Sequence, residues 1–256
     1  MLQFEKPVYK ITDSVESNFY GKFELEPLER GFGNTIGNAL RRVMLSSLPG
    51  SAISSIKIEG VLHEFQTIDG VYEDVATIIL NLKGVVIKNH TNGPKTLHLN
   101  ATEEGEVTAG DIESDPDVEI INKDKVIATL SKGGKLNMEI VVTNGRGYVD
   151  SEINKKLLDI KKPGVIAIDS SYSPIERVSY EVEPARVGQD ETYDKLVLEV
   201  WTNGSMKPEE AIALASRILI EHFELLTDLS SIADVSGMMI EKTEDPKTKA
   251  LETSIE

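Results

Sequence analysis

The sequence predicts an α+β fold in which both ends of the chain form one domain and the middle is an insertion. Three observations predict this fold: strand patterns occur near both ends, a long helical pattern follows each of them, and the middle consists mostly of short β segments. The chain has 256 residues, of which 40% are hydrophobic, so it is long enough for one large or two modest domains with buried cores.

The N-terminal part predicts two strands and a helix. Residues 7–26 alternate around turn signals, which is typical of two antiparallel strands. The glycines of segment 28–33 allow a tight entry into a helix from about Asn34 to Leu48. Pro49 and Gly50 end this helix, because proline cannot continue it.

The middle of the chain, residues 51–173, predicts short strands around one helix. The apolar β segments are Ser54–Glu59, Val85–Lys88, Val126–Leu130 and Leu136–Thr143. An amphipathic pattern predicts a helix over about Tyr72–Leu82. We expect the acidic segment Glu103–Glu119 and the polar segment Asn144–Lys162 to form surface loops or strand edges.

The C-terminal part predicts two further strands, Ile175–Arg186 and Tyr193–Thr202, and a second long helix, Pro208–Leu229. Proline in the first turn, followed by Glu209 and Glu210, is typical of a helix start. Lys207 at the N-cap position is unexplained by these rules. We therefore expect one domain from residues 1–50 and 174–235, an inserted domain from 51–173, and a flexible linker over 236–256.

The composition excludes several classes of protein. No apolar run approaches the ~18 residues of a membrane span, and the N-terminus lacks a signal-peptide pattern, so we expect a cytoplasmic protein that contacts no membrane. The absence of cysteine excludes disulfides and thiolate metal sites. A net charge of −16 would repel a phosphate backbone over most of the surface.

Both long helices have more apolar surface than one layer needs. On the first helix, one stripe contains Ile36, Ala39, Leu40, Val43, Met44 and Ser47. Leu45 lies opposite this stripe with Arg41 and Arg42 beside it, a composition typical of a protein interface. Apolar residues of the second helix cover roughly half its circumference, wider than the ~100° stripe that packs on one layer. Either a partner covers this surface, or both helices are sandwiched inside a large monomer.

The sequence predicts no catalytic, cofactor or metal site. The glycines of segment 31–37 do not match a dinucleotide loop, and Thr67 stands where a zinc-protease motif beginning at His63 needs a second histidine. His222 falls on the apolar face of the second helix, where a hydrogen-bonded core or interface histidine is expected. The dense carboxylates between Asp111 and Glu119 are typical of a solvated acidic edge.

One long motif and several shorter ones resemble a known family. Residues 25–50 read LEPLERGFGNTIGNALRRVMLSSLPG, followed by GVLHEF at 60–65, GVYEDV at 70–75 and NGRGY at 144–148. VGQ at 187–189 leads into YDKL at 193–196, and WTNG at 201–204 leads to EEA at 209–211. In this order, over about residues 5–230, the sequence resembles the alpha subunit of bacterial DNA-directed RNA polymerase.

The resemblance implies a dimerisation domain carrying an inserted, mostly β domain, in a homodimeric scaffold that holds the beta and beta-prime subunits. It implies contacts with the beta subunit at Arg42 and Leu45 and, by weaker correspondence, at Arg41, His63, Glu64 and Gly70. Arg41 could instead be a solvated neighbour, and His63 and Glu64 could be a pair that orders their own loop. The residues implied at the dimer interface are Ile36, Leu40, Val43, Ile218, Leu219, His222, Phe223 and Leu226.

The chain departs from this family at its C-terminus. In the family, a linker leads to a small domain that binds promoter DNA and activators, whereas this sequence stops at Glu256. We therefore expect a truncated chain that does not bind DNA directly. A stand-alone homodimeric interaction protein with the same fold is the alternative. A hydrolase that uses the acidic loops is a third hypothesis, for which no nucleophile and base pair is visible.

Overall fold

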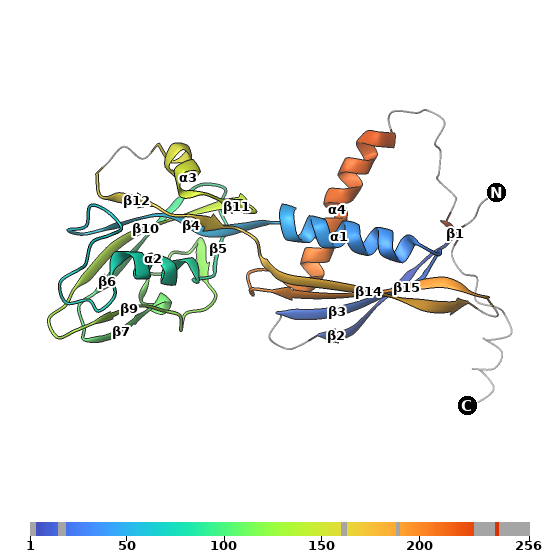
Figure 1. Cartoon of the computed structure of the whole chain (residues 1–256), viewed down its shortest axis with the longest axis horizontal. Helices are drawn as coiled ribbons and strands as arrows, with labels where there is room; N and C mark the ends of the chain where they lie inside the picture. The colour runs from blue at the N-terminus through green and yellow to red at the C-terminus, as the bar shows by residue number, and fades with distance from the viewer. Residues whose placement is uncertain (1–3, 15–18, 160–162, 188–189, 228–238, 241–256) are drawn as a thin grey trace.

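The computed structural model describes residues 4–14, 19–159, 163–187, 190–227 and 239–240. It is an elongated molecule in which two parts lie side by side (Figure 1). One part is a four-stranded sheet with two long helices, and the other is built around a six-stranded sheet. The predicted α+β class is confirmed.

Both ends of the chain contribute to the four-stranded antiparallel sheet. Its strand order is β14-β15-β3-β2. Strand β3 of the N-terminal part pairs with β15 of the C-terminal part, with Phe23 opposite Leu198. The strands are β2 (Val8–Ser14), β3 (Tyr20–Leu28), β14 (Ile175–Val187) and β15 (Asp190–Thr202).

Helix α1 (Phe32–Ser47) lies over this sheet, and the predicted end before Pro49 is confirmed (Figure 1). Its buried residues are Gly33, Gly37, Leu40 and Met44. The predicted stripe was therefore partly wrong, because it omitted the two glycines. A Cβ atom at Gly37 would lie 2.6 Å from the ring of Tyr180, so the missing side chain lets α1 approach the sheet closely.

Helix α4 (Pro208–Thr227) crosses α1 and extends beyond it (Figure 1). Its first turns bury Pro208, Ala211 and Ala215. The backbone amide of Lys207 donates a hydrogen bond to the Glu210 carboxylate at 3.5 Å, which is one half of a capping box and explains how a lysine is accommodated before the helix. The predicted end at Leu229 lies outside the described residues.

The six-stranded sheet has the order β6-β10-β4-β5-β8, with β12 also paired to β4. Strand β4 follows α1 directly and runs through the centre of this sheet. The strands are β4 (Pro49–Ile58), β5 (Ile87–Asn89), β6 (Lys95–Ala101), β8 (Val118–Ile120), β10 (Leu136–Arg146) and β12 (Val165–Ala167). A smaller sheet pairs β7 (Gly105–Thr108) with β9 (Val126–Leu130). The sequence predicted the strand β9 with these bounds, but not β7.

Helix α2 (Val75–Lys83) packs its apolar face into the same core and begins later than predicted. The carboxylate of Asp74 accepts a hydrogen bond from the Thr77 amide at 2.8 Å, so the helix starts at this N-cap rather than at Tyr72.

The two segments predicted as loops or strand edges contain more structure than expected. Segment 103–119 forms β7, the 3₁₀ turn Ala109–Asp111 and the start of β8, and it buries Val107 and Ile112 in the core. Segment 144–162 contains β11 (Tyr148–Val149), which pairs with β13 (Ser170–Ser171), and helix α3 (Ser151–Leu157). Both predictions were wrong in part, because local polar caps rather than apolar periodicity organise these short elements.

The described residues form two separate hydrophobic cores. One joins α2 to the six-stranded sheet, and the other joins α1 and α4 to the four-stranded sheet. Of the predicted linker, only β16 (Met239–Ile240) is described, and it pairs in parallel with β1 (Phe4–Glu5).

Candidate protein-interaction surfaces

The N-terminus of α1 is anchored by a residue from the far end of the chain. The Asp194 carboxylate on β15 accepts hydrogen bonds from the backbone amides of Gly31 at 2.8 Å and Gly33 at 3.3 Å. Gly31 itself provides no side-chain cap. The position of α1 on the sheet is therefore set jointly by this carboxylate and by the close approach at Gly37.

An open apolar groove of about 730 Å³ lies between α1, α4 and the edge strand β2. Its base is formed by Phe23 and Leu198 of the sheet, and its polar lining residues include Glu24. Lys195 holds that carboxylate at 3.1 Å, and this hydrogen bond, with a second one to Glu183, raises the pKa of Lys195. The charge of Glu24 is thus neutralised within the sheet, and the groove remains an apolar surface.

Four of the eight residues predicted at a dimer interface line this groove, namely Ile36, Leu40, Leu219 and Phe223. Val43 and Ile218 are half-buried and pack against the core beside it. The remaining two, His222 and Leu226, are exposed on the last turns of α4. All eight residues belong to α1 or α4, and half of them line the groove.

The last two turns of α4 carry large apolar side chains that the described residues leave exposed. Ile220, Phe223, Leu225 and Leu226 are between 51% and 70% exposed. Nδ1 of His222 donates a hydrogen bond to the Ile218 carbonyl at 2.7 Å, because a carbonyl oxygen can only accept. The predicted hydrogen bond is therefore present, but the side chain is exposed and not in the core, so its place in an interface stays a prediction. A helix end with so much exposed apolar surface is typical of a protein contact.

Two residues of the groove were missed by the sequence analysis. Tyr9 and Ile11 of β2 line it and are 74% and 52% exposed. The available signal was that apolar residues in this strand occupy both alternating positions, with Val8 on one and Tyr9 and Ile11 on the other. A strand that is apolar at both positions requires cover on both faces.

A second patch lies on the outer side of α1. Arg41 and Arg42 are exposed and Leu45 is 40% exposed, as predicted from their position opposite the core stripe. The Ser46 hydroxyl donates to the Arg42 carbonyl at 2.8 Å and so belongs to the local helix backbone network. None of these three residues lines the groove, so the two surfaces of α1 are distinct.

The other predicted contact residues lie in the loop after β4. His63 and Glu64 are exposed, and the Gln66 side chain accepts hydrogen bonds from the backbone amides of Leu62 and His63. Gly70 has a positive φ of 80° and packs against Gly134, so its role is at least partly conformational. In Figure 1 this loop belongs to the part of the molecule built around the six-stranded sheet, whereas α1 lies in the other part.

This loop also exposes aromatic residues that the sequence analysis did not select. Phe65 and Tyr72 are 82% and 76% exposed. The ring of His63 lies 6.5 Å from that of Phe65. No periodic pattern could have revealed them, because they lie in irregular backbone.

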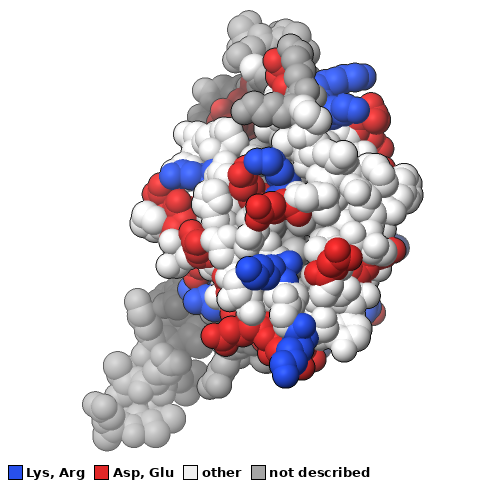
Figure 2. Space-filling model, turned by 90° about the vertical axis from the view of Figure 1, so that its left-hand side faces the viewer, with Lys and Arg blue, Asp and Glu red and all other residues white. Residues whose placement is uncertain are grey.

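The charge distribution on the inserted part of the chain favours binding to protein over binding to a nucleic-acid backbone. On the face shown in Figure 2, most lysine and arginine side chains lie next to acidic or uncharged residues, and no broad basic patch is visible. Binding to a nucleic-acid backbone needs several adjacent cations. Among the described residues, no group of three or more His, Asp or Glu side chains is placed to hold a metal ion, and no helix is long and apolar enough to cross a membrane.

Comparisons with known proteins identify relatives of the chain. Residues 56–173 match the family described as the RNA polymerase Rpb3/RpoA insert domain. The DNA-directed RNA polymerase subunit alpha of Desulforamulus reducens is 56% identical over 256 residues, which cover 100% of this chain and 81% of the relative. Those of Clostridium perfringens and Symbiobacterium thermophilum are 55% and 54% identical with the same coverage.

Proposed function

The chain belongs to the family of bacterial DNA-directed RNA polymerase alpha subunits, and on this premise we propose that it is a homodimeric, non-catalytic scaffold that holds the beta and beta-prime subunits. The observation that carries the proposal is the apolar groove between α1, α4 and β2, together with the exposed end of α4.

A second copy of the chain is the occupant that fits this groove. The groove needs an apolar partner, and the exposed end of α4 is itself an apolar element next to it. In a two-fold symmetric dimer, the same patch of each copy forms the interface. The end of α4 of one copy can therefore pack into the groove of the other, and the reverse contact follows by symmetry. The interface then contains Ile36, Leu40, Val43, Ile218, Leu219, His222, Phe223 and Leu226 as predicted, and also Tyr9 and Ile11.

The outer patch of α1 remains accessible in such a dimer and serves as the contact with the beta subunit. Arginine beside leucine is a composition typical of residues that dominate protein interfaces. Arg42 and Leu45 are the principal contacts, and Arg41 is their neighbour. His63, Glu64 and Gly70 form a second, separate contact in the loop after β4.

The two hydrophobic cores support the division into domains. Residues 1–50 and 174–235 form the dimerisation domain, residues 51–173 form the inserted domain, and residues 236–256 form a linker. The proposal assigns no catalytic role to the chain, because the surfaces described above are helix faces and loops rather than clusters of titratable groups. The subunits it holds then carry out the nucleotidyl transfer.

The test is assembly. The purified 28.2 kDa chain should sediment as a dimer at micromolar concentration, and it should co-purify with the beta and beta-prime subunits after co-expression. A folded monomer at that concentration would contradict the dimer. A dimer that recovers neither large subunit would support the stand-alone interaction protein instead.

A further inference from the structure

The chain crosses between its two parts twice, and the two crossings lie side by side. It enters the inserted part where α1 leads directly into β4 at Pro49 (Figure 1), and it leaves over residues 172–174, between β13 and β14. A Cβ atom at Gly50 would lie 3.0 Å from the carbonyl carbon of Tyr172, so the two segments touch. Two adjacent crossings act as a hinge, about which one part can rotate relative to the other unless a further contact holds it.

A third contact between the two parts involves Phe19, Gly204 and Ile121, and we call it the latch. Phe19 precedes β3 and Gly204 follows β15, whereas Ile121 follows β8 of the inserted part. A Cβ atom at Gly204 would lie 2.9 Å from Cζ of Phe19 and 3.1 Å from Cγ2 of Ile121. The ring of one part and the aliphatic side chain of the other therefore meet at a glycine, whose missing side chain leaves room for both.

Backbone hydrogen bonds hold Phe19 and Gly204 in place. The Thr202 amide donates to the Phe19 carbonyl at 2.7 Å, and the Asn203 amide donates to the Pro174 carbonyl at 3.0 Å. Gly204 has a positive φ of 92°, which glycine adopts without strain. Phe19 is thus tied to the turn before α4, and that turn is tied to the second crossing.

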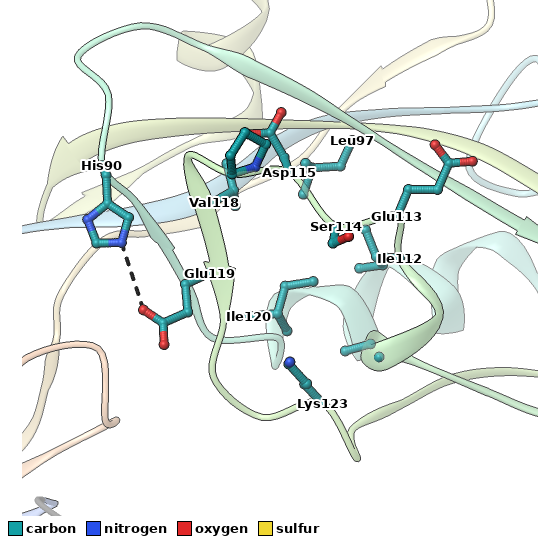
Figure 3. A pocket seen from close by; sticks show the side chains of 13 residues that line it. His90, Leu97, Ile112, Glu113, Ser114, Asp115, Val118, Glu119, Ile120 and Lys123 are labelled. Atoms are coloured by element: carbon teal, nitrogen blue, oxygen red, sulfur yellow. Dashed lines mark ion pairs between the residues drawn. The ribbon is translucent and has the colours of Figure 1, made fainter.

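Ile121 is held as firmly on the inserted part. Its amide donates to the Val86 carbonyl at 2.9 Å, and the Asn122 side chain accepts from the Val86 amide at 2.8 Å. The preceding Ile120 lines a pocket of the inserted part with Ile112 (Figure 3) and packs against its core. Because side chains alternate along a strand, Ile120 anchors the end of β8 while Ile121, which does not line that pocket, reaches the latch.

The two proposed contacts with the beta subunit lie on opposite sides of this hinge. The outer patch of α1 belongs to the part with the four-stranded sheet, and the loop containing His63 and Glu64 belongs to the inserted part. Two linked sites bind one partner more tightly than either site alone, provided that their geometry lets both engage at once. A hinge that rotated freely would reduce this gain, because binding would have to fix its angle.

We propose that the latch is a positioning contact, which fixes the angle between the two parts so that both surfaces engage one beta subunit together. This inference rests on the proposed function. The angle is set when the chain folds, so binding of the beta subunit restricts the chain less than it would without the latch.

The first measurement concerns the angle alone and does not involve the beta subunit. The sequence contains no cysteine, so Glu104→Cys with Glu181→Cys provides one exposed spin-label site in each part. An excess of unlabelled chain leaves one labelled copy in each dimer. Double electron–electron resonance should give a narrow distance distribution for the intact latch, and one at least about 1.5-fold broader in Phe19→Ala and in Ile121→Ala.

The matched control for these variants is Ile153→Ala on α3. Ile153 is 49% exposed and Phe19 is 44% exposed, so both substitutions remove a half-exposed apolar side chain. The distance distribution of Ile153→Ala should equal that of the wild type. Thermal melts confirm that each variant is folded.

The second measurement tests whether the angle matters for assembly. Phe19→Ala should weaken binding of the beta subunit about tenfold, although it changes neither contact surface. In a chain that already carries His63→Ala and Glu64→Ala, only the outer patch of α1 can bind, so the same substitution should change the affinity less than about twofold. Ile121→Ala should give the same pattern from the other side of the latch.

Three outcomes would overturn the inference. Unchanged distance distributions in Phe19→Ala and Ile121→Ala would show that the latch does not set the angle. Equal losses of binding in both backgrounds would show that Phe19 acts through the fold or touches the beta subunit directly. Full binding by His63→Ala with Glu64→Ala would remove the second contact and with it the need for a fixed angle.

Failure of the proposed function would be seen separately. A wild-type chain that bound no beta subunit would contradict the scaffold, and the assembly role of the latch would fall with it. The spin-label distances would still show whether the latch fixes the angle, because they are measured on the dimer alone.

Discussion

The Asp194 carboxylate accepts the backbone amide of Gly31 at 2.8 Å and thereby caps helix α1 from the neighbouring sheet. Replacing it by alanine leaves two amides at the helix start without their acceptor. We expect Asp194→Ala to lower the free energy of unfolding by about 1 kcal/mol, the usual cost of a lost N-cap. Urea denaturation measures this change. Glu181→Ala, an exposed carboxylate on β14, is the control, and an equal loss there would contradict the capping role.

Asp169, between β12 and β13, connects helices α2 and α3 of the inserted part. Its carboxylate binds Lys83 at 2.8 Å and the Ser151 amide at 2.9 Å, and the Lys83 hydrogen bond is the main reason that its pKa falls from 3.8 to about 2. Because the folded pKa lies below the unfolded one, this carboxylate stabilises the fold above pH 3.8, and the stabilisation is lost as the pH falls towards 2.

Asp169→Asn should therefore be less stable than the wild type by at most about 2 kcal/mol at pH 7. The difference should shrink as the pH is lowered and disappear near pH 2. Denaturation of both proteins between pH 2 and pH 7 measures the difference directly and cancels the effect of the other carboxylates. A difference that is independent of pH would show that Asp169 acts through packing and not through its charge.

Gly37 marks the closest approach of α1 to the sheet. An added Cβ atom would lie 2.6 Å from Cδ2 of Tyr180 and 2.9 Å from Cδ1 of Leu196. Alanine favours a helix by about 1 kcal/mol over glycine, but the overlap outweighs this gain, so we expect Gly37→Ala to destabilise the protein by about 1–2 kcal/mol. Asn38→Ala, one residue along on the exposed side, should be neutral or stabilising. A more stable Gly37→Ala would mean that the helix shifts freely on the sheet.

These contacts show where sequence analysis of the fold stops. The end of α1 before Pro49 and several of the strands were predictable, because proline, glycine and alternating apolar residues act locally. The approach at Gly37 was not, because an apolar stripe counts side chains and glycine has none. Helix α3 was missed because its seven residues depend on the Asp150 cap and on the buried hydrogen bonds of Asn154 to Ile168 and Ser170.

The candidate surfaces were predictable to a similar extent. The excess apolar width of α4 and the position of Leu45 opposite the core stripe follow from helical geometry alone. The apolar residues at both alternating positions of β2 were a sequence signal for Tyr9 and Ile11, but only the structure shows that β2 is an edge strand beside both helices. Asp194 required the structure, since the amides it binds are 161 to 163 residues away in sequence.

Phe223 tests the groove as a dimer interface. Its side chain is 57% exposed in the single chain and should become buried in the dimer. Phe223→Ser should weaken dimerisation at least about tenfold, because it removes a large aromatic contact that is made only between copies. Sedimentation over a concentration series measures the change. Leu157→Ser on α3, 73% exposed and remote from the groove, should leave the dimer intact. If Phe223→Ser dimerised as tightly as Leu157→Ser, the groove would not be part of the dimer interface.

Arg42 tests the outer patch of α1 as the contact with the beta subunit. Because Arg42 is exposed and lies outside the groove, Arg42→Ala should keep the fold and the dimer. It should weaken binding of the beta subunit at least about tenfold, as expected for an arginine that dominates an interface. Co-purification with tagged beta subunit measures binding, and sedimentation of the same preparation measures the dimer.

The control for Arg42→Ala is Lys156→Ala, which removes one positive charge from exposed α3. Leu45→Ala should reproduce the defect of Arg42→Ala without changing the net charge, which separates a specific contact from long-range electrostatics. If Arg42→Ala recovered as much beta subunit as the wild type while Leu45→Ala did not, the leucine alone would carry the contact and the arginine would be a solvated neighbour. If both variants assembled normally, the outer patch of α1 would not bind the beta subunit, and the loop containing His63 and Glu64 would be the next surface to test.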